Sequence, residues 1–186
     1  GDRVAIGAYL NDGTGSAAGH VRVYEYSDSS WTQLGSDIDG EAEGDLSGRS
    51  VSMNSAGDRV AIGAYLNDGT GSAAGHVRVY EYSDSSWTQL GSDIDGEAAD
   101  DRSGYSVSMC SVGDRVAIGA YLNDGTGSDA GHVRVYEYSN SSWTQLGDDI
   151  DGEAADDRSG TSVSMDSDGD RVAIGAYLND GTGSAA

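Results

Sequence analysis

Three stretches of closely spaced carboxylates have the clearest chemical potential in this chain. They share the pattern Asp-Ile-Asp-Gly-Glu, at 37–41, 93–97 and 149–153. Ca²⁺ takes six to eight oxygen ligands, and alternate carboxylates on a turn can converge on such an ion. The pattern predicts calcium ligands, which are Asp93, Asp95, Glu97, Asp149, Asp151 and Glu153. The alternative is a solvated acidic loop that favours solubility, with Arg102 and Arg158 paired to nearby acids.

A second acidic place is a short turn that occurs once per unit. Its last copy contains three carboxylates, those of Asp166, Asp168 and Asp170. The corresponding turns at 54–58 and 110–114 have one carboxylate each, which is too few for Ca²⁺. Cys110 lies in one of these turns and is the only cysteine. We therefore predict calcium ligation in the last copy alone, and no other cofactor.

The remaining reactive residue types argue against catalysis. His20, His76 and His132 recur once per unit, which favours hydrogen-bonded structural histidines over metal ligands. No Gly-x-Ser-x-Gly motif is present. An active site needs different residues in different roles, whereas the units here are nearly identical and differ mostly at single turn positions. The sequence therefore predicts no catalytic residues and a protein that is not an enzyme, with a hydrolase or lyase as the remote alternative.

Aromatic residues offer a binding chemistry instead. Trp31, Trp87 and Trp143 each follow a Ser-Ser pair and could stack on sugar rings. Their alternative role is to pack a sheet edge against its neighbour. Asn140 begins the only Asn-x-Ser/Thr sequence and is a glycosylation site if the chain is secreted.

The net charge limits the classes of partner that this chain can bind. The chain has 186 residues, with 10 basic and 32 acidic side chains and a net charge of −22. Binding to a phosphate backbone requires a basic face, so nucleic acid is excluded as a partner. No run of 18 apolar residues is present, and anionic lipid would repel the chain, so we expect no membrane insertion.

Internal repetition sets the architecture that must position these residues. The string GDRVAIGAYLNDGTGS begins at positions 1, 57, 113 and 169, so its spacing is 56 each time (57 − 1, 113 − 57 and 169 − 113). In the second unit, four runs have β-type composition and are separated by turn residues: 49–53, 59–65, 76–82 and 86–90. The run 59–65 is apolar or small on both faces, so we expect it to be covered on both sides.

The pattern predicts an all-β fold of tandem four-stranded antiparallel blades in a β-propeller-like array. A β-solenoid is the alternative. The expected segments are a partial blade at 1–48, blades at 49–104 and 105–160, and a partial blade at 161–186. They contain thirteen strands, or about three blades, whereas propellers close with about four to eight. The chain therefore does not close a ring alone, and we expect self-association or neighbouring repeats of a longer chain.

The strand sequences resemble those of a known family. Ser-Gly-Tyr-Ser-Val-Ser-Met at 103–109, Gly-Asp-Arg-Val-Ala-Ile-Gly-Ala at 113–120 and Gly-His-Val-Arg-Val-Tyr at 131–136 resemble the FG-GAP repeat of integrin-α-like β-propellers. Two departures stand out: Gly63-Ala64-Tyr65 replaces the family's Gly-Ala-Pro, and the family's calcium hairpin is shortened.

Uniform units, acidic charge and this resemblance together predict a function. We expect a non-enzymatic extracellular structural or adhesion module, secreted or on the cell surface, within a larger repetitive assembly or filament. Its partners would be neighbouring repeats, glycans or other surface proteins. The alternative is a carbohydrate-binding, lectin-like propeller.

Overall fold

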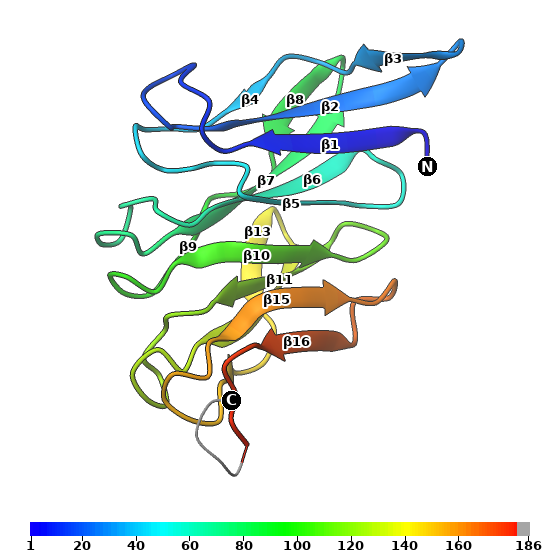
Figure 1. The fold of residues 1–186 in the computed structure, drawn as a ribbon. Helices are drawn as coiled ribbons and strands as arrows, with labels where there is room; N and C mark the ends of the chain where they lie inside the picture. Colours follow the sequence, from blue (N-terminus) through cyan, green and yellow to red (C-terminus); the bar gives the residue numbers. More distant parts are fainter. Residues whose placement is uncertain (182–186) are drawn as a thin grey trace.

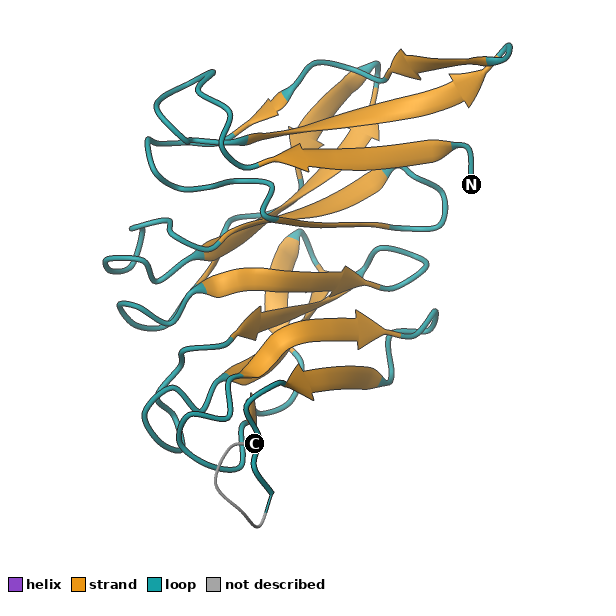
Figure 2. Ribbon diagram, in the orientation of Figure 1, coloured by secondary structure: helices purple, strands orange, loops and turns teal. Residues whose placement is uncertain are grey.

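The computed structural model describes residues 1–181, and in that range the chain forms strands and loops without a helix (Figures 1 and 2). The strands form antiparallel sheets stacked one after another along the chain, as the sequence predicts. The fold is therefore an all-β, propeller-like array of about three blades that does not close on itself.

In each sheet the longer strands pair in chain order, and we number the sheets as blades 1 to 4. Blade 1 contains β1 (Arg3–Ala8), β2 (His20–Ser27), β3 (Ser30–Gln33) and β4 (Ile38–Asp39). Blade 2 contains β5 (Ser50–Met53), β6 (Arg59–Ala64), β7 (His76–Ser83), β8 (Ser86–Gln89) and β9 (Ile94–Asp95). Blade 3 contains β10 (Ser103–Met109), β11 (Arg115–Ala120), β12 (His132–Ser139), β13 (Ser142–Gln145) and β14 (Ile150–Asp151). Blade 4 contains β15 (Ser159–Met165) and β16 (Val172–Ala176).

Sixteen strands are described where the sequence predicted thirteen. The three additional strands are the Ile-Asp dipeptides of β4, β9 and β14, which pair with the first residues of β2, β7 and β12, respectively. A two-residue strand has too few side chains to show a period-2 pattern, so the sequence does not reveal it. The inner strand β10 also begins at Ser103, two residues before the predicted blade boundary, across a β-bulge.

Apolar packing lies between consecutive blades. Val60 and Ile62 of β6 pack on blade 1, whereas Ala61, on the opposite face, joins the cluster formed with blade 3. All three are at most 2% exposed, which confirms that this strand is covered on both sides. The equivalent Ile6 in blade 1 has no preceding blade among the described residues and is 51% exposed. Covering half of such a side chain is worth about 1 kcal/mol.

Serine and glycine set the distance between blades. Ser50 donates its hydroxyl to the carbonyl oxygen of Gly104 in the next blade at 2.7 Å, and Ser106 does the same to Gly160. A β-carbon on Gly63 would lie 2.0 Å from the Gly104 oxygen, so only glycine allows this approach. The inner strands β5, β10 and β15 consequently lie close together along one side of the stack.

No helix long and apolar enough to cross a membrane occurs in the described part of the chain.

Candidate functional site

One recurrent site lies at the first residue of β2, β7 and β12, which is a histidine in each case. His76 is the first residue of β7, and it is paired with Ala64 of β6 on one side and with Asp95 of β9 on the other. Its position between two strands, with the preceding blade above it, leaves the residue 1% exposed. His132 occupies the same place in blade 3 and is equally buried.

Carboxylates surround each of these histidines. Nδ1 of His76 lies 3.6 Å from Oδ2 of Asp93 in its own blade and 3.9 Å from Oε2 of Glu41 in the preceding blade. The equivalent group in blade 3 is Glu97, His132 and Asp149. We call these two groups the interface clusters, because each combines residues of two blades.

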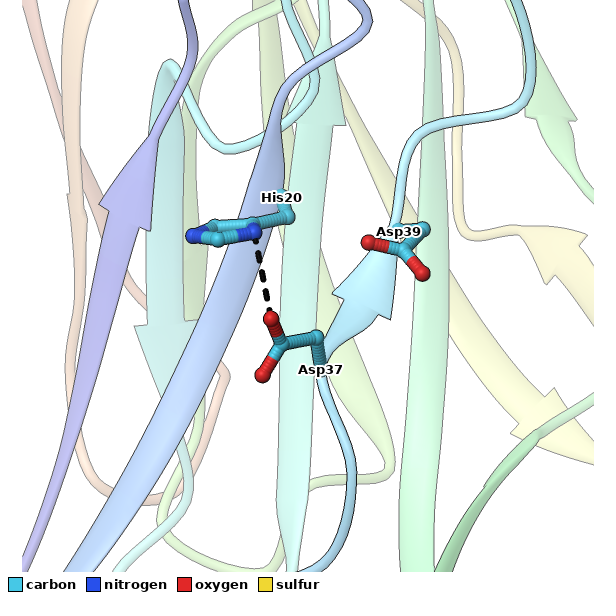
Figure 3. A group of neighbouring side chains, drawn as sticks. All are labelled: His20, Asp37 and Asp39. Carbon is cyan, nitrogen blue, oxygen red and sulfur yellow. Dashed lines mark ion pairs between the residues drawn. The ribbon is translucent and has the colours of Figure 1, made fainter. Parts of the chain in front are cut away.

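Blade 1 shows the same histidine without a preceding blade. There His20 lies beside Asp37 and Asp39, with Nδ1 3.4 Å from Oδ2 of Asp37 (Figure 3). Arg22 holds both oxygens of Asp37, at 2.9 and 2.8 Å. This ion pair, together with a hydrogen bond from Gln33, lowers the pKa of Asp37 to about 2.

Burial sets the protonation of the interface histidines. Removal from water, reinforced by the positive charge of Arg78, lowers the pKa of His76. Burial and Arg134 act in the same way on the pKa of His132. Both imidazoles are therefore neutral at neutral pH and keep one nitrogen lone pair, which can accept a proton or bind a metal ion.

The carboxylates predicted as calcium ligands are distributed differently from the expectation. Asp93 faces His76, whereas Glu97, four residues later, belongs to the next interface cluster with His132. Asp149 faces His132, Asp151 lies 4.0 Å from its Nδ1, and Asp95 contributes its backbone carbonyl to Arg134. The carboxylate of Glu153 accepts a hydrogen bond from Asn179. Carboxylates of one Asp-Ile-Asp-Gly-Glu copy thus serve two different interfaces.

The carboxylates of the last turn mainly shape its backbone. Oδ1 of Asp166 accepts the N–H groups of Asp170 and Arg171, and Asp168 lies beside Ser167. None of the three belongs to a convergent His/Cys/Asp/Glu group in the described range. In blade 3, buried Cys110 is the equivalent of Asp166, and its sulfur accepts the N–H of Arg115 as Asp166 accepts that of Arg171.

The tryptophans join neighbouring outer edges. The indole N–H of Trp87 donates to the Leu34 carbonyl of the preceding blade at 2.8 Å, and that of Trp143 donates to Leu90. Trp31, in blade 1, has no blade before it in the described chain and is 54% exposed. Trp87 and Trp143 thus pack one sheet edge against the next, which is the alternative to sugar stacking that the sequence offered. The glycosylation candidate Asn140 is exposed in a two-residue turn, with a φ of 51°.

A second site is a groove along the inner strands of blades 2, 3 and 4. It has a volume of about 500 Å³ and is lined by one three-residue segment from each blade. The segments are 49–51, 105–107 and 161–163, with sequences Arg-Ser-Val, Tyr-Ser-Val and Thr-Ser-Val. We call it the inner groove. The repeats are identical at its serine and valine positions and differ only at the first.

Arg49 and Tyr105 are in direct contact at this groove. The guanidinium of Arg49 donates to the Tyr105 hydroxyl at 3.0 Å and lies over its ring. Tyr65 and Tyr121 pack against the same ring. Arg102, which the solvated-loop alternative would pair with nearby acids, lies over the Tyr65 ring. The groove therefore presents one guanidinium, one phenol and several aliphatic hydroxyls, which can bind a polyhydroxylated molecule and polarise a carbonyl group.

Comparison with known proteins gives the fold but no family. Neither a protein-family model nor a curated protein matches the sequence, so the resemblance to FG-GAP repeats stays a prediction. Solved structures do match. A protein of Bacteroides uniformis assigned as a 6-phosphogluconolactonase has a TM-score of 0.58 and 11% identity over 91% of this chain, and one of Bacteroides fragilis with the same assignment has a TM-score of 0.51 and 13% identity over 78%. The periplasmic gluconolactonase of Pseudomonas aeruginosa has a TM-score of 0.53 and 13% identity over 91% of this chain. This chain spans 46%, 38% and 46% of those chains, less than half of each.

These comparisons contradict the predicted non-enzymatic adhesion module. The propellers that share the fold are named as lactonases, which are enzymes. At this identity the likeness establishes the fold alone. Near-identical repeats do not by themselves exclude a composite site, because stacking brings the one divergent position of the groove, at 49, 105 and 161, into a single cavity.

Proposed function

We propose that the inner groove binds a sugar-acid lactone and promotes its hydrolysis, as part of a larger propeller completed by further blades. The observation that carries the proposal is the convergence of Arg49, Tyr105 and Thr161 on one cavity. Repeated blades thereby supply different groups to one ligand, which is what an active site requires. The lactonase names of the structures with the same fold support this choice of substrate.

Lactone hydrolysis adds water to the ring carbonyl carbon, and the ring C–O bond then breaks. Arg49 and Tyr105 would donate hydrogen bonds to the carbonyl oxygen as it becomes an oxyanion. No carboxylate or imidazole occurs among the described residues that line the groove. A second water molecule therefore carries the proton from the attacking water to the leaving ring oxygen.

Charge favours an uncharged lactone over a phosphorylated one. The chain has a net charge of −22, and Arg49 is the only cation among the described residues that line the groove. The surrounding field repels a phosphate dianion, and salt screens that repulsion. Any hydrolysis of a 6-phosphorylated lactone should therefore rise with ionic strength, whereas that of glucono-1,5-lactone should change little.

The test is acid release from glucono-1,5-lactone, measured in a pH-stat above the buffer rate. Arg49→Gln should lower kcat/KM about 10- to 100-fold, since a hydrogen bond from a charged donor is worth about 1.5 to 3 kcal/mol. Arg171→Gln is the control, because this arginine is 79% exposed and does not line the groove. A wild-type rate equal to the buffer rate, or equal losses in both variants, would refute the proposal.

A further inference from the structure

The interface cluster of blade 3 contains a buried polar atom without a partner. Nδ1 of His132 is inaccessible to solvent and makes no hydrogen bond. It faces Asp149 at 3.5 Å and Asp151 at 4.0 Å. A buried, unpaired ring nitrogen costs free energy unless another group satisfies it. From this geometry we infer that the two interface clusters each bind a divalent transition-metal ion of the Zn²⁺ class, which ties consecutive blades together.

The distances fit a shared metal ion better than direct hydrogen bonds. Nδ1 lies 3.5 Å from the facing aspartate oxygen at His132 and 3.6 Å at His76. The donor and acceptor of an N–H···O bond are usually about 2.9 Å apart. Two atoms bound tetrahedrally to one Zn²⁺, each at about 2.0 to 2.1 Å, lie about 3.3 to 3.4 Å apart. The Glu41 oxygen, at 3.9 Å from His76, needs only a small side-chain movement to join them.

Neighbouring side chains already orient each carboxylate. Gln89 donates to Oδ1 of Asp93 at 2.6 Å, which leaves Oδ2 facing the imidazole. Arg78 pairs with Oε1 of Glu41 at 3.2 Å, which leaves Oε2 on the His76 side. Outer hydrogen bonds of this kind fix the ligands of protein metal sites. Gln145 and Arg134 repeat the arrangement around Asp149 and Glu97.

Blade 1 shows that the site needs two blades. Without a preceding glutamate, Arg22 turns to Asp37 of its own blade and occupies both of its oxygens. In blades 2 and 3 the equivalent arginines reach back to Glu41 and Glu97. Asp37 also faces its histidine, but Arg22 holds its Oδ2, whereas no arginine in the described part of the chain pairs with Asp93 or Asp149. We therefore expect two metal ions per chain, and none at His20.

The ligand set selects the metal. Each cluster offers one imidazole nitrogen and two carboxylates, and this leaves one position of a tetrahedral ion for water. Ca²⁺ requires six to eight oxygen ligands, which one cluster does not supply. Among divalent ions, sites with nitrogen ligands bind Zn²⁺ more tightly than Mn²⁺. The calcium expected from the sequence is thus replaced, at these carboxylates, by a zinc-class ion.

The experiment titrates the EDTA-treated, dialysed chain with ZnCl₂ at physiological salt and follows heat release. We expect two equivalents for the wild type, one each for Asp93→Asn and Asp149→Asn, and none for the double variant. These aspartates are about 30% exposed, so the amide should not prevent folding. Asp84→Asn is the matched control, because the equivalent turn residue of the third unit is Asn140; it should retain two.

Co²⁺ provides a second readout, since a four-coordinate site gives much stronger visible absorption than six-coordinate ions bound at the surface. We expect this absorption to halve in each single variant and to disappear in the double variant. Absence of zinc binding to the wild type overturns the inference. So does an equal stoichiometry in wild type and double variant, or displacement of Zn²⁺ by equimolar Ca²⁺, because each would indicate general attraction to an acidic surface.

Discussion

Replacing Gly63 by alanine tests whether glycine sets the spacing between blades. An added β-carbon would lie 2.0 Å from the carbonyl oxygen of Gly104, whereas ordinary contact begins at 3.4 Å. The shortfall of about 1.4 Å must come from backbone movement, because the oxygen belongs to the main chain of the next blade. The φ of Gly63 lies outside the left-handed region, so alanine adds no other backbone strain.

The structure gives the size of the effect. The Ser50 hydroxyl lies 2.7 Å from the same Gly104 oxygen. A shift of about 1.4 Å along this direction lengthens the contact to about 4.1 Å, which is beyond hydrogen-bonding range. The loss of the bond costs about 1 kcal/mol, and overpacking adds about 1 to 3 kcal/mol. With a total near 3 kcal/mol, Tm should fall by roughly 6 to 12 °C for a chain of this size.

Gly175 supplies the matched control. It holds the same position in β16, but its nearest neighbour would be the Ser162 hydroxyl, at 2.4 Å, which can rotate away. Gly175→Ala should therefore leave stability unchanged, or raise it by up to about 1 kcal/mol through a less flexible unfolded chain. The assay is thermal unfolding followed by circular dichroism. Similar Tm values for the two variants would show that the contact at Gly104 does not limit blade spacing.

Two further predictions concern the aromatic residues between blades. Burial raises the pKa of Tyr80, so the folded chain keeps this phenol proton at a pH where the unfolded chain has lost it. The contribution of the protonated phenol to stability is therefore complete below pH 10 and is lost as the pH rises through the pKa of the folded state. The fall in Tm at alkaline pH should be smaller in Tyr80→Phe. Trp87→Phe removes the hydrogen bond to Leu34 and should cost about 1 kcal/mol in urea unfolding, whereas Trp31→Phe should cost almost nothing because that ring is half exposed; equal costs would contradict the packing role.

The fold was largely predictable because its signals are local and repeated. β-Branched residues in alternation and Gly/Asp turns define each strand, and every unit repeats the same pattern at the same spacing. The second strand of blade 2, predicted at 59–65, is β6 at Arg59–Ala64. Short β9 was missed because pairing of Ile94 and Asp95 depends on the neighbouring strand rather than on their own propensity.

The sites were less predictable, because neighbours in the sequence are not neighbours across a blade interface. Asp93 and Glu97 lie four residues apart, on either side of β9, yet they belong to different clusters. The structural role predicted for the histidines stays a prediction, and the sequence held one signal for the proposed metal clusters. Glu41 precedes His76 by the same interval as Glu97 precedes His132 (76 − 41 = 132 − 97 = 35).

The sequence by itself determined that this chain is a series of similar, four-stranded, acidic sheets, because the residues that specify each strand and turn lie within a single repeat. Only the tertiary structure decided which residues meet. Blade stacking places Arg49 beside Tyr105 and Glu97 beside His132, although each pair is separated by tens of residues. The physical reason is that apolar faces such as that of Ile62 must be covered by the neighbouring blade, and the depth and angle of that contact set every distance in both sites.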